Sequence, residues 1–144
     1  MATGLAAVHR AGIVHRDLKP QNLFYTTFNG VKSWKLLDFG VSKFEGSQGT
    51  LTCNQLVGTP AFMSPEQAKS IEVDTRSDVF SLGCVLYAME FGLSPFEMQE
   101  GGNVKMAVLN GRIPWDDETN RFSSQYNSLV KKALRVDPSK RSSL

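Results

Sequence analysis

Acidic, basic and amide side chains cluster in the first 40 residues at spacings that could support phosphate chemistry. They form groups in a fixed order, which are His15-Arg16-Asp17, then Asn22, then Asp38-Phe39-Gly40. Two carboxylates and an amide carbonyl that converge on one point suit Mg²⁺, a hard ion that prefers oxygen ligands. Lys19 adds a compact positive charge beside that point, which suits a phosphate oxygen. The residue types therefore indicate a magnesium-dependent phosphate site.

The alternative is that these are ordinary solvated turn residues. Each motif taken singly is a weak signal, because a charged residue in a turn is more often solvated than catalytic. The groups occur together, however, with apolar "IV" before the first and "LF" after Asn22. Surface charge is therefore the poorer explanation of the whole set.

A β-hairpin is predicted between Asn22 and Asp38. The segments "NLFYT" and "SWKLLDF" are rich in β-prone residues, and the Asn29-Gly30 pair between them is a strong turn signal. A hairpin returns the chain to its starting edge, so Asp38 is expected close to Asn22. Ahead of the polar cluster, residues 3–11 have helical spacing up to Gly12, and "IVH" is a short strand-like piece.

The remaining segments predict a mainly helical domain. From Gly40 to about Thr59 the chain is polar and is expected to be a long loop without regular structure. Helices are predicted at "SPEQAKS", opened by Ser64 and Pro65, at 76–91, apolar almost all round, at 103–109, closed by Gly111, and at 124–136. The last helix carries an apolar stripe of Tyr126, Leu129, Val130, Ala133 and Leu134.

The composition is that of an ordinary globular domain. With 144 residues, 41% of them hydrophobic, the chain can bury a core, and a net charge of +2 does not suggest a nucleic-acid or membrane partner. We interpret Cys84 as a small core residue and Cys53 as an inert surface thiol. No secretory signal is visible, and the longest apolar run, 79–91, is too short to span a bilayer. We therefore expect an intracellular, cytoplasmic setting.

Several motifs together give the sequence a specific resemblance to one enzyme family. In order they are "HRDLKPQN" at 15–22, "DFG" at 38–40, "GTPAFMSPE" at 58–66, "SDVFSLG" at 77–83 and "DPSKR" at 137–141. Over essentially its whole length the sequence resembles the C-terminal lobe of eukaryotic-type protein kinases. In that resemblance "HRDLKPQN" matches the catalytic loop, "DFG" the metal-binding motif and "GTPAFMSPE" the end of the activation segment. The resemblance implies a mainly α fold, the helical lobe of the α+β kinase fold with a small β-hairpin at the catalytic cleft and no N-terminal lobe. Residues 1–144 would be a partial kinase domain, from the end of the helix before the catalytic loop to the Arg141 motif.

The resemblance implies transfer of a phosphoryl group from ATP to a protein hydroxyl, with Mg²⁺ as cofactor. Asp17 would orient the substrate hydroxyl and accept its proton. Lys19 would neutralise charge on the γ-phosphate. Asn22 would hold one Mg²⁺, and Asp38 would hold the ions that bridge the nucleotide phosphates.

Other matched positions would support the site. Phe24, with Leu23, would form part of the floor under the adenine. His15 and Phe39 would stack as apolar packing partners, so that His15 is structural rather than catalytic. Gly40 completes the metal-binding motif.

Matched charged residues outside the catalytic loop would hold the architecture together. Asp78, at the head of an apolar helix, would be a costly buried charge without partners, and in the family it accepts backbone N–H bonds from the catalytic loop. A simple N-cap is the alternative for Asp78, and both roles could hold. Glu66 would pair with Arg141 in a buried ion pair that ties the activation segment to the last helices.

Substrate class and regulation follow from the same resemblance. "LKPQN" and Thr59 match the Ser/Thr-kinase pattern, with Thr59 hydrogen-bonding toward Asp17 and Lys19, so the partner is a protein with a Ser or Thr acceptor. Arg16 implies that a phosphate on the activation loop pairs with it and orders the segment. The candidate acceptors are Ser47, Thr50 and Thr52, of which Thr50 and Thr52 are the preferred sites.

The sequence contains no Gly-rich loop and no recognisable strand lysine for gripping the α- and β-phosphates. We therefore expect the 144 residues alone to have little or no kinase activity. Two hypotheses follow: part of an active Ser/Thr kinase, or a non-catalytic, pseudokinase-like interaction module. Asp17, Lys19, Asn22 and Asp38 favour the enzyme, because a binding module has no physical need for all four. The sequence does not indicate an oligomeric state.

Overall fold

The computed structural model describes residues 2–39, 43–44, 60–97, 103–111, 113 and 124–141. The α-helices in these ranges are α1 (Ala2–Arg10), α2 (Pro65–Ala68), α3 (Thr75–Phe91), α4 (Val104–Asn110) and α5 (Ser124–Ala133). The strands are β1 (Ile13–Val14), β2 (Leu23–Phe28), β3 (Val31–Leu36) and β4 (Lys43–Phe44), and short 3₁₀ turns lie at Pro20–Asn22, Pro60–Phe62 and Pro138–Lys140. The domain is thus a mixed α/β structure of helices and small antiparallel sheets. Within these ranges, no helix combines the length and the apolar character needed to cross a bilayer.

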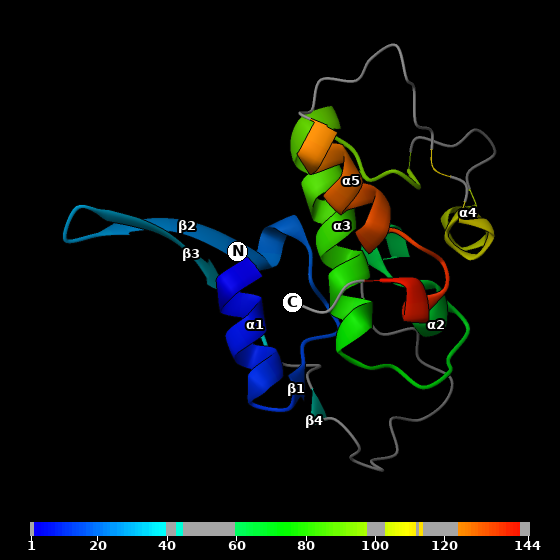
Figure 1. The fold of residues 1–144 in the computed structure, drawn as a ribbon, viewed down its shortest axis with the longest axis horizontal. Helices are drawn as coiled ribbons and strands as arrows, with labels where there is room; N and C mark the ends of the chain where they lie inside the picture. The colour runs from blue at the N-terminus through cyan, green and yellow to red at the C-terminus, as the bar shows by residue number, and fades with distance from the viewer. Residues whose placement is uncertain are drawn as a thin grey trace.

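Helix α3 lies in the middle of the molecule, as its apolar sequence predicts (Figure 1). The Asp74 side chain caps it by accepting a hydrogen bond from the Arg76 amide at 2.8 Å, and Gly92 ends it in a left-handed conformation at φ 83°. Residues 77–85 of the helix are all buried, including Phe80 and Cys84. Burial raises the pKa of the Cys84 thiol well above its ordinary value, which supports the interpretation of this cysteine as a core residue.

Helix α5 packs alongside α3 but is shorter than predicted. It ends at Ala133 rather than at residue 136. Leu129, placed on the apolar stripe by its spacing, is 54% exposed, whereas its neighbour Val130 is fully buried. Adjacent helical residues point about 100° apart. The face of α5 that packs on α3 is too narrow to bury both Leu129 and Val130.

The crossing of α3 and α5 depends on Gly83. A methyl group at this position would lie 2.9 Å from Ala133 Cβ and 3.0 Å from Leu134. We expect Gly83→Ala to lower the free energy of unfolding by about 1–3 kcal/mol, because the helices must separate to admit the methyl group. Urea denaturation would measure this loss. Gly4→Ala is the matched control, since a methyl group on α1 meets nothing within 4 Å. A Gly83→Ala variant as stable as the wild type would show that the helices can move apart freely.

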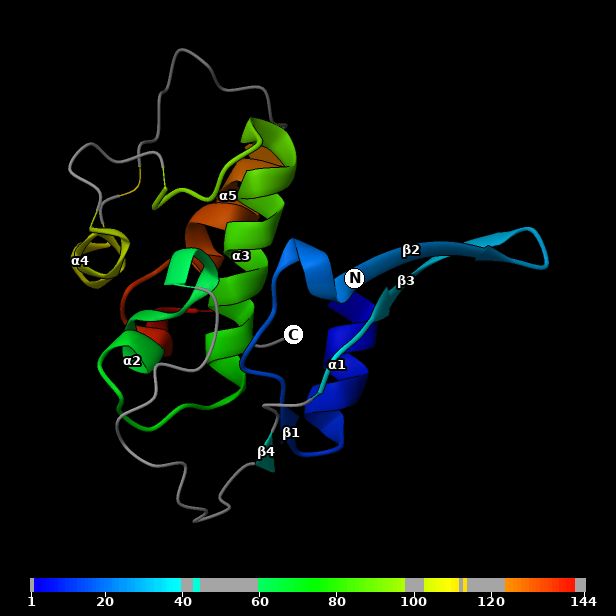
Figure 2. The same cartoon turned by 180° about the vertical axis from the view of Figure 1, so that it is seen from behind.

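The predicted hairpin is confirmed and is longer than its sequence segments indicate. Strand β2 pairs antiparallel with β3 from Leu23↔Leu36 to Phe28↔Val31. Asn29 and Gly30 form the two-residue turn with φ of 50° and 76°, the conformation that an Asn-Gly pair favours. The hairpin projects sideways from the helices, and only its base is packed against them (Figure 2).

The prediction of a loop without regular structure after Gly40 is wrong at Lys43 and Phe44. These two residues form β4, which pairs antiparallel with β1. So short a pairing leaves no periodic pattern in the sequence, but it supplies hydrogen-bond partners for the backbone beside the catalytic loop. Gly40 and residues 45–59 lie outside the described residues.

Candidate active site

One buried carboxylate on α3 binds the backbone of the catalytic loop. Asp78 is 0% exposed, and its two oxygens accept hydrogen bonds from the amides of His15 and Arg16, each at 2.8 Å. These bonds satisfy a charge that would otherwise be very costly to bury. The N-cap alternative is wrong for this residue, because Asp74 caps the helix. Asp78 therefore determines where the segment that carries Asp17 lies.

A further side chain on this carboxylate is absent from the sequence-based predictions. His9, from α1, has its Nε2 atom 2.9 Å from Asp78 Oδ2. His9 lies four residues after the buried Leu5, so both residues share one face of α1. That spacing is the signal that could have shown His9 pointing inward.

His15 connects the catalytic loop to the end of β3. Its Nδ1 atom accepts a hydrogen bond from the Asp17 amide at 3.3 Å, so the opposite nitrogen, Nε2, donates to the carbonyl of Leu37 at 3.1 Å. The ring also meets Phe39 edge to face, with centroids 5.0 Å apart. His15 is fully buried.

The side chains of Lys19 and Asn22 both lie within hydrogen-bond distance of Asp17. Lys19 Nζ is 2.6 Å from Asp17 Oδ2. The Asn22 amide nitrogen donates to the Asp17 carbonyl at 2.7 Å and to Asp17 Oδ2 at 3.3 Å. The loop thus holds a carboxylate, an ammonium group and an amide in one partly buried cluster.

Asp38 follows directly on the hairpin, and the hairpin brings it back toward this cluster. The backbone amide of Leu37 donates a hydrogen bond to the carbonyl of Asn22 at 2.8 Å. Asp38 is the next residue after this contact with the catalytic loop. Asp38 and Arg16 both have left-handed backbone conformations, with φ of 59° and 70°. Such strain costs on the order of 1–3 kcal/mol and is concentrated at functional sites.

The Arg16 guanidinium is held in a partly buried position. Among the described residues, its Nε atom has no hydrogen-bond partner. Burial lowers the pKa of Arg16, and the nearby charge of Asp78 opposes that effect. A buried donor without a partner is unusual and calls for an acceptor.

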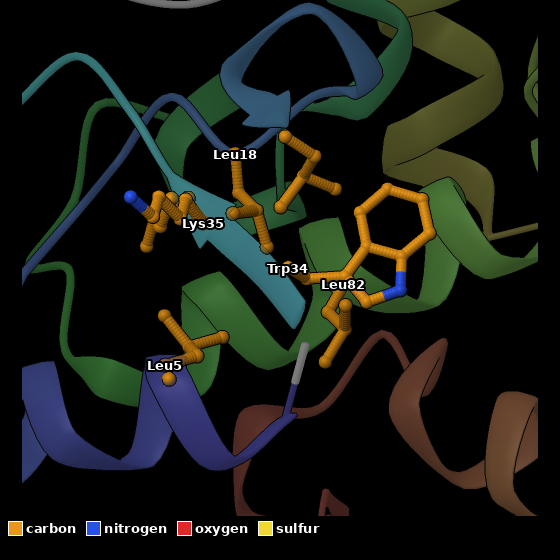
Figure 3. A pocket seen from close by; sticks show the side chains of 8 residues that line it. Leu5, Leu18, Trp34, Lys35 and Leu82 are labelled. Carbon is orange, nitrogen blue, oxygen red and sulfur yellow. The ribbon is translucent and has the colours of Figure 1, made fainter. Parts of the chain in front are cut away.

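Leu23 and Phe24 lie on opposite faces of β2, as neighbouring strand residues do. Leu23 packs against the buried cluster of Leu5, Leu18 and Leu82. These three leucines line the pocket shown in Figure 3. The contact of Leu23 with the adenine stays a prediction. Phe24 is 56% exposed, so its ring is accessible to a ligand.

Glu66 and Arg141 form a buried ion pair that joins α2 to the end of the chain's last described segment. Arg141 contacts both Glu66 oxygens, at 2.5 and 2.9 Å, and the Ser77 hydroxyl donates to the first of them at 2.5 Å. The guanidinium also lies 4.9 Å from the centre of the Phe80 ring. Its remaining donors go to the carbonyls of Arg76, Arg135 and Val136.

This ion pair predicts an acid-sensitive contribution to stability. Burial alone would raise the pKa of Glu66, but the hydrogen bonds from Arg141 and Ser77 outweigh it and the pKa is lowered from 4.5. The contribution is therefore complete above pH 4.5 and is lost as the pH falls through the lowered pKa. We expect the unfolding free energy of Glu66→Gln to depend less on pH below 4.5 than that of the wild type. Parallel acid dependence in urea titrations would contradict this assignment.

Several predicted positions lie outside the described residues: Gly40, Ser47, Thr50, Thr52, Cys53 and Thr59.

Comparison with known proteins identifies the family of the chain. The protein kinase domain family matches residues 1–144. The chain belongs to the protein kinase family. Over 144 residues it is 38% identical to a calcium and calcium/calmodulin-dependent serine/threonine-protein kinase of Medicago truncatula, covering 99% of this chain and 27% of the relative. It is 40% identical over 140 residues to a serine/threonine-protein kinase of Corynebacterium efficiens, covering 97% of this chain and 26% of the relative. The kinase chain thus spans about a quarter of the length of these relatives.

Proposed function

We propose that this chain carries the catalytic loop of a serine/threonine protein kinase, which transfers the γ-phosphoryl group of ATP to a Ser or Thr hydroxyl of a protein. The observation that carries the proposal is the cluster of Asp17, Lys19 and Asn22, suspended from the buried carboxylate of Asp78. The naming of its relatives as serine/threonine kinases supports the same activity.

Asp17 is the proposed base. Lys19 and Asn22 both contact its Oδ2 atom, which fixes the carboxylate in one orientation. As the substrate oxygen bonds to the γ-phosphorus and the bond to the bridging β–γ oxygen breaks, Asp17 accepts the hydroxyl proton and ADP departs. Lys19, beside it, reduces the negative charge on the transferred group. The geometry supplies positioning and electrostatic stabilisation, which are the main contributions to this reaction.

Asn22 and Asp38 fit the Mg²⁺ that the family uses. Because the Asn22 amide nitrogen donates to Asp17, its amide oxygen is the atom assigned to the metal. Within the described parts of the chain, no group of three or more His, Cys, Asp or Glu residues could hold an ion. Mg²⁺ is commonly bound by one or two carboxylates together with substrate phosphates. When bound, Mg²⁺ neutralises phosphate charge.

We assign these residues to the C-terminal lobe of the kinase domain, from the end of the helix before the catalytic loop to the Arg141 motif. Phe24, on the exposed face of β2, is the residue proposed to contact the adenine from below. The sequence holds no Gly-rich loop to cover the phosphates. The isolated 144 residues are therefore proposed to be inactive or nearly so.

Arg16 is proposed to bind a phosphate group on the activation segment, where Thr50 or Thr52 is the residue that is phosphorylated. The support is its buried Nε atom, which has no partner within the described ranges and would gain an anionic acceptor. Mass spectrometry of active full-length protein tests this assignment. Activity with this segment unmodified would refute it.

The activity is tested with the full-length protein that carries this sequence. Incubation with Mg²⁺ and γ-labelled ATP in the presence of a degenerate Ser/Thr peptide mixture should give labelled phosphoserine or phosphothreonine. Binding of Mg-ATP without any transfer would instead support the alternative, a pseudokinase-like interaction module.

A further inference from the structure

The side-chain amide of Gln67 joins α2 to the catalytic loop. Its nitrogen, Nε2, donates to the carbonyl oxygen of Arg16 at 2.7 Å, a contact between residues 51 positions apart. At its other end, Oε1 accepts a hydrogen bond from the amide of Ser64 at 3.0 Å. One amide therefore bridges the start of α2 and the residue before Asp17.

Helix capping explains only half of this arrangement. The Ser64 hydroxyl accepts a hydrogen bond from the backbone amide of Gln67 at 3.3 Å, and Gln67 Oε1 accepts one from the backbone amide of Ser64, which completes a capping box. A glutamate serves a capping box as well as a glutamine does, because only the acceptor oxygen is used. The Nε2 donor is not needed by the cap, and it is the atom that contacts Arg16.

The contacted residue is the strained one. Arg16 has φ of 70°, a conformation that persists only where the surroundings hold it. Its amide is held by Asp78 and its carbonyl by Gln67, so two side chains from distant segments hold its backbone on both sides. The Arg16 carbonyl belongs to the same planar peptide unit as the Asp17 amide. Fixing this carbonyl therefore fixes the plane from which Asp17 projects.

Helix α2 is fixed to the core beside Gln67. Its Glu66, next to Gln67, is held by Arg141 and Ser77 in the buried ion pair. The helix lies near the first turns of α3, the helix that carries Asp78 (Figures 1 and 2). Asp78 and Gln67, the two side chains that bind the Arg16 backbone, thus lie on neighbouring helices of the same core.

We propose that Gln67 is a positioning residue for Asp17, which acts by holding the Arg16–Asp17 peptide in its strained orientation. The proposal rests on the proposed kinase function, because its main readout is phosphoryl transfer. It predicts that loss of the Nε2 donor lowers kcat while the capping box and the overall stability remain.

The decisive variant is Gln67→Glu in the full-length protein. It keeps the capping acceptor but places a carboxylate oxygen against the Arg16 carbonyl. We expect kcat to fall about 10- to 100-fold through misplacement of Asp17, with unchanged KM for ATP and unchanged melting temperature. Ser64→Ala is the matched control, since it removes the cap hydroxyl and keeps the Nε2 contact. It should lower the melting temperature by about 2–4 °C and leave kcat close to that of the wild type.

Each outcome decides whether Gln67 positions Asp17 or only caps α2. Wild-type kcat in Gln67→Glu, or equal kcat losses in both variants, would overturn the positioning role. An inactive wild-type protein would refute the kinase function rather than this contact. In that case amide hydrogen exchange over residues 13–18 still tests it: Gln67→Glu should speed exchange in that segment alone, and unchanged exchange would overturn the proposal.

Discussion

Replacement of Asp17 by Asn in the full-length protein is expected to lower kcat by about 10²–10⁴-fold, the range lost with a general base. Asparagine keeps the shape of the side chain and its contact with Asn22 but cannot accept the proton of the substrate hydroxyl. The KM for ATP should change little, because Asn22 and Asp38 are the residues assigned to the metal. Initial-rate measurements at varied ATP would separate the two parameters.

Asp74→Asn is the matched control for this experiment. Asp74 caps α3, and Asn is as good a cap as Asp, so this variant makes the same chemical change without affecting the site. It should retain wild-type kcat. If Asp17→Asn also retained wild-type kcat, Asp17 would not be the base, and the cluster with Lys19 would have another role.

Replacement of Arg141 by Met is expected to lower the free energy of unfolding by about 3–5 kcal/mol. Methionine keeps much of the apolar stem but leaves Glu66 buried without its partner. Glu66 is 3% exposed, so water cannot replace the lost guanidinium contacts. Urea denaturation of both proteins at pH 7 would measure the difference.

The neighbouring Lys140→Met is the control for this loss. Lys140 lies 3.9 Å from Asp137 in an ion pair that is largely exposed. Exposed pairs contribute about 0–1 kcal/mol, so little stability should be lost. Equal effects of the two substitutions would show that the buried pair is no stronger than a surface one. Arg141→Met should also loosen α2, and with it the contact of Gln67 with Arg16.

Local sequence was sufficient to predict much of the framework. Asn29-Gly30 predicts the hairpin because few residue pairs adopt two successive positive φ angles, and this pair does. Ser64 and Pro65 mark the start of α2, and Gly92 and Gly111 close α3 and α4. These signals work because caps and turns depend on residues only a few positions apart.

The tertiary structure decided the parts that depend on distant contacts. The contacts of His9 with Asp78 and of Gln67 with Arg16 join residues 69 and 51 positions apart, so no local pattern identifies the partner of either side chain. The exposure of Leu129 depended on how much of α5 the neighbouring α3 could cover. The sequence by itself determined the residues that can do the chemistry, their order and the hairpin between them. Only the folded chain decided which distant side chains hold the Arg16–Asp17 peptide, because long-range hydrogen bonds form between segments whose local sequences are independent.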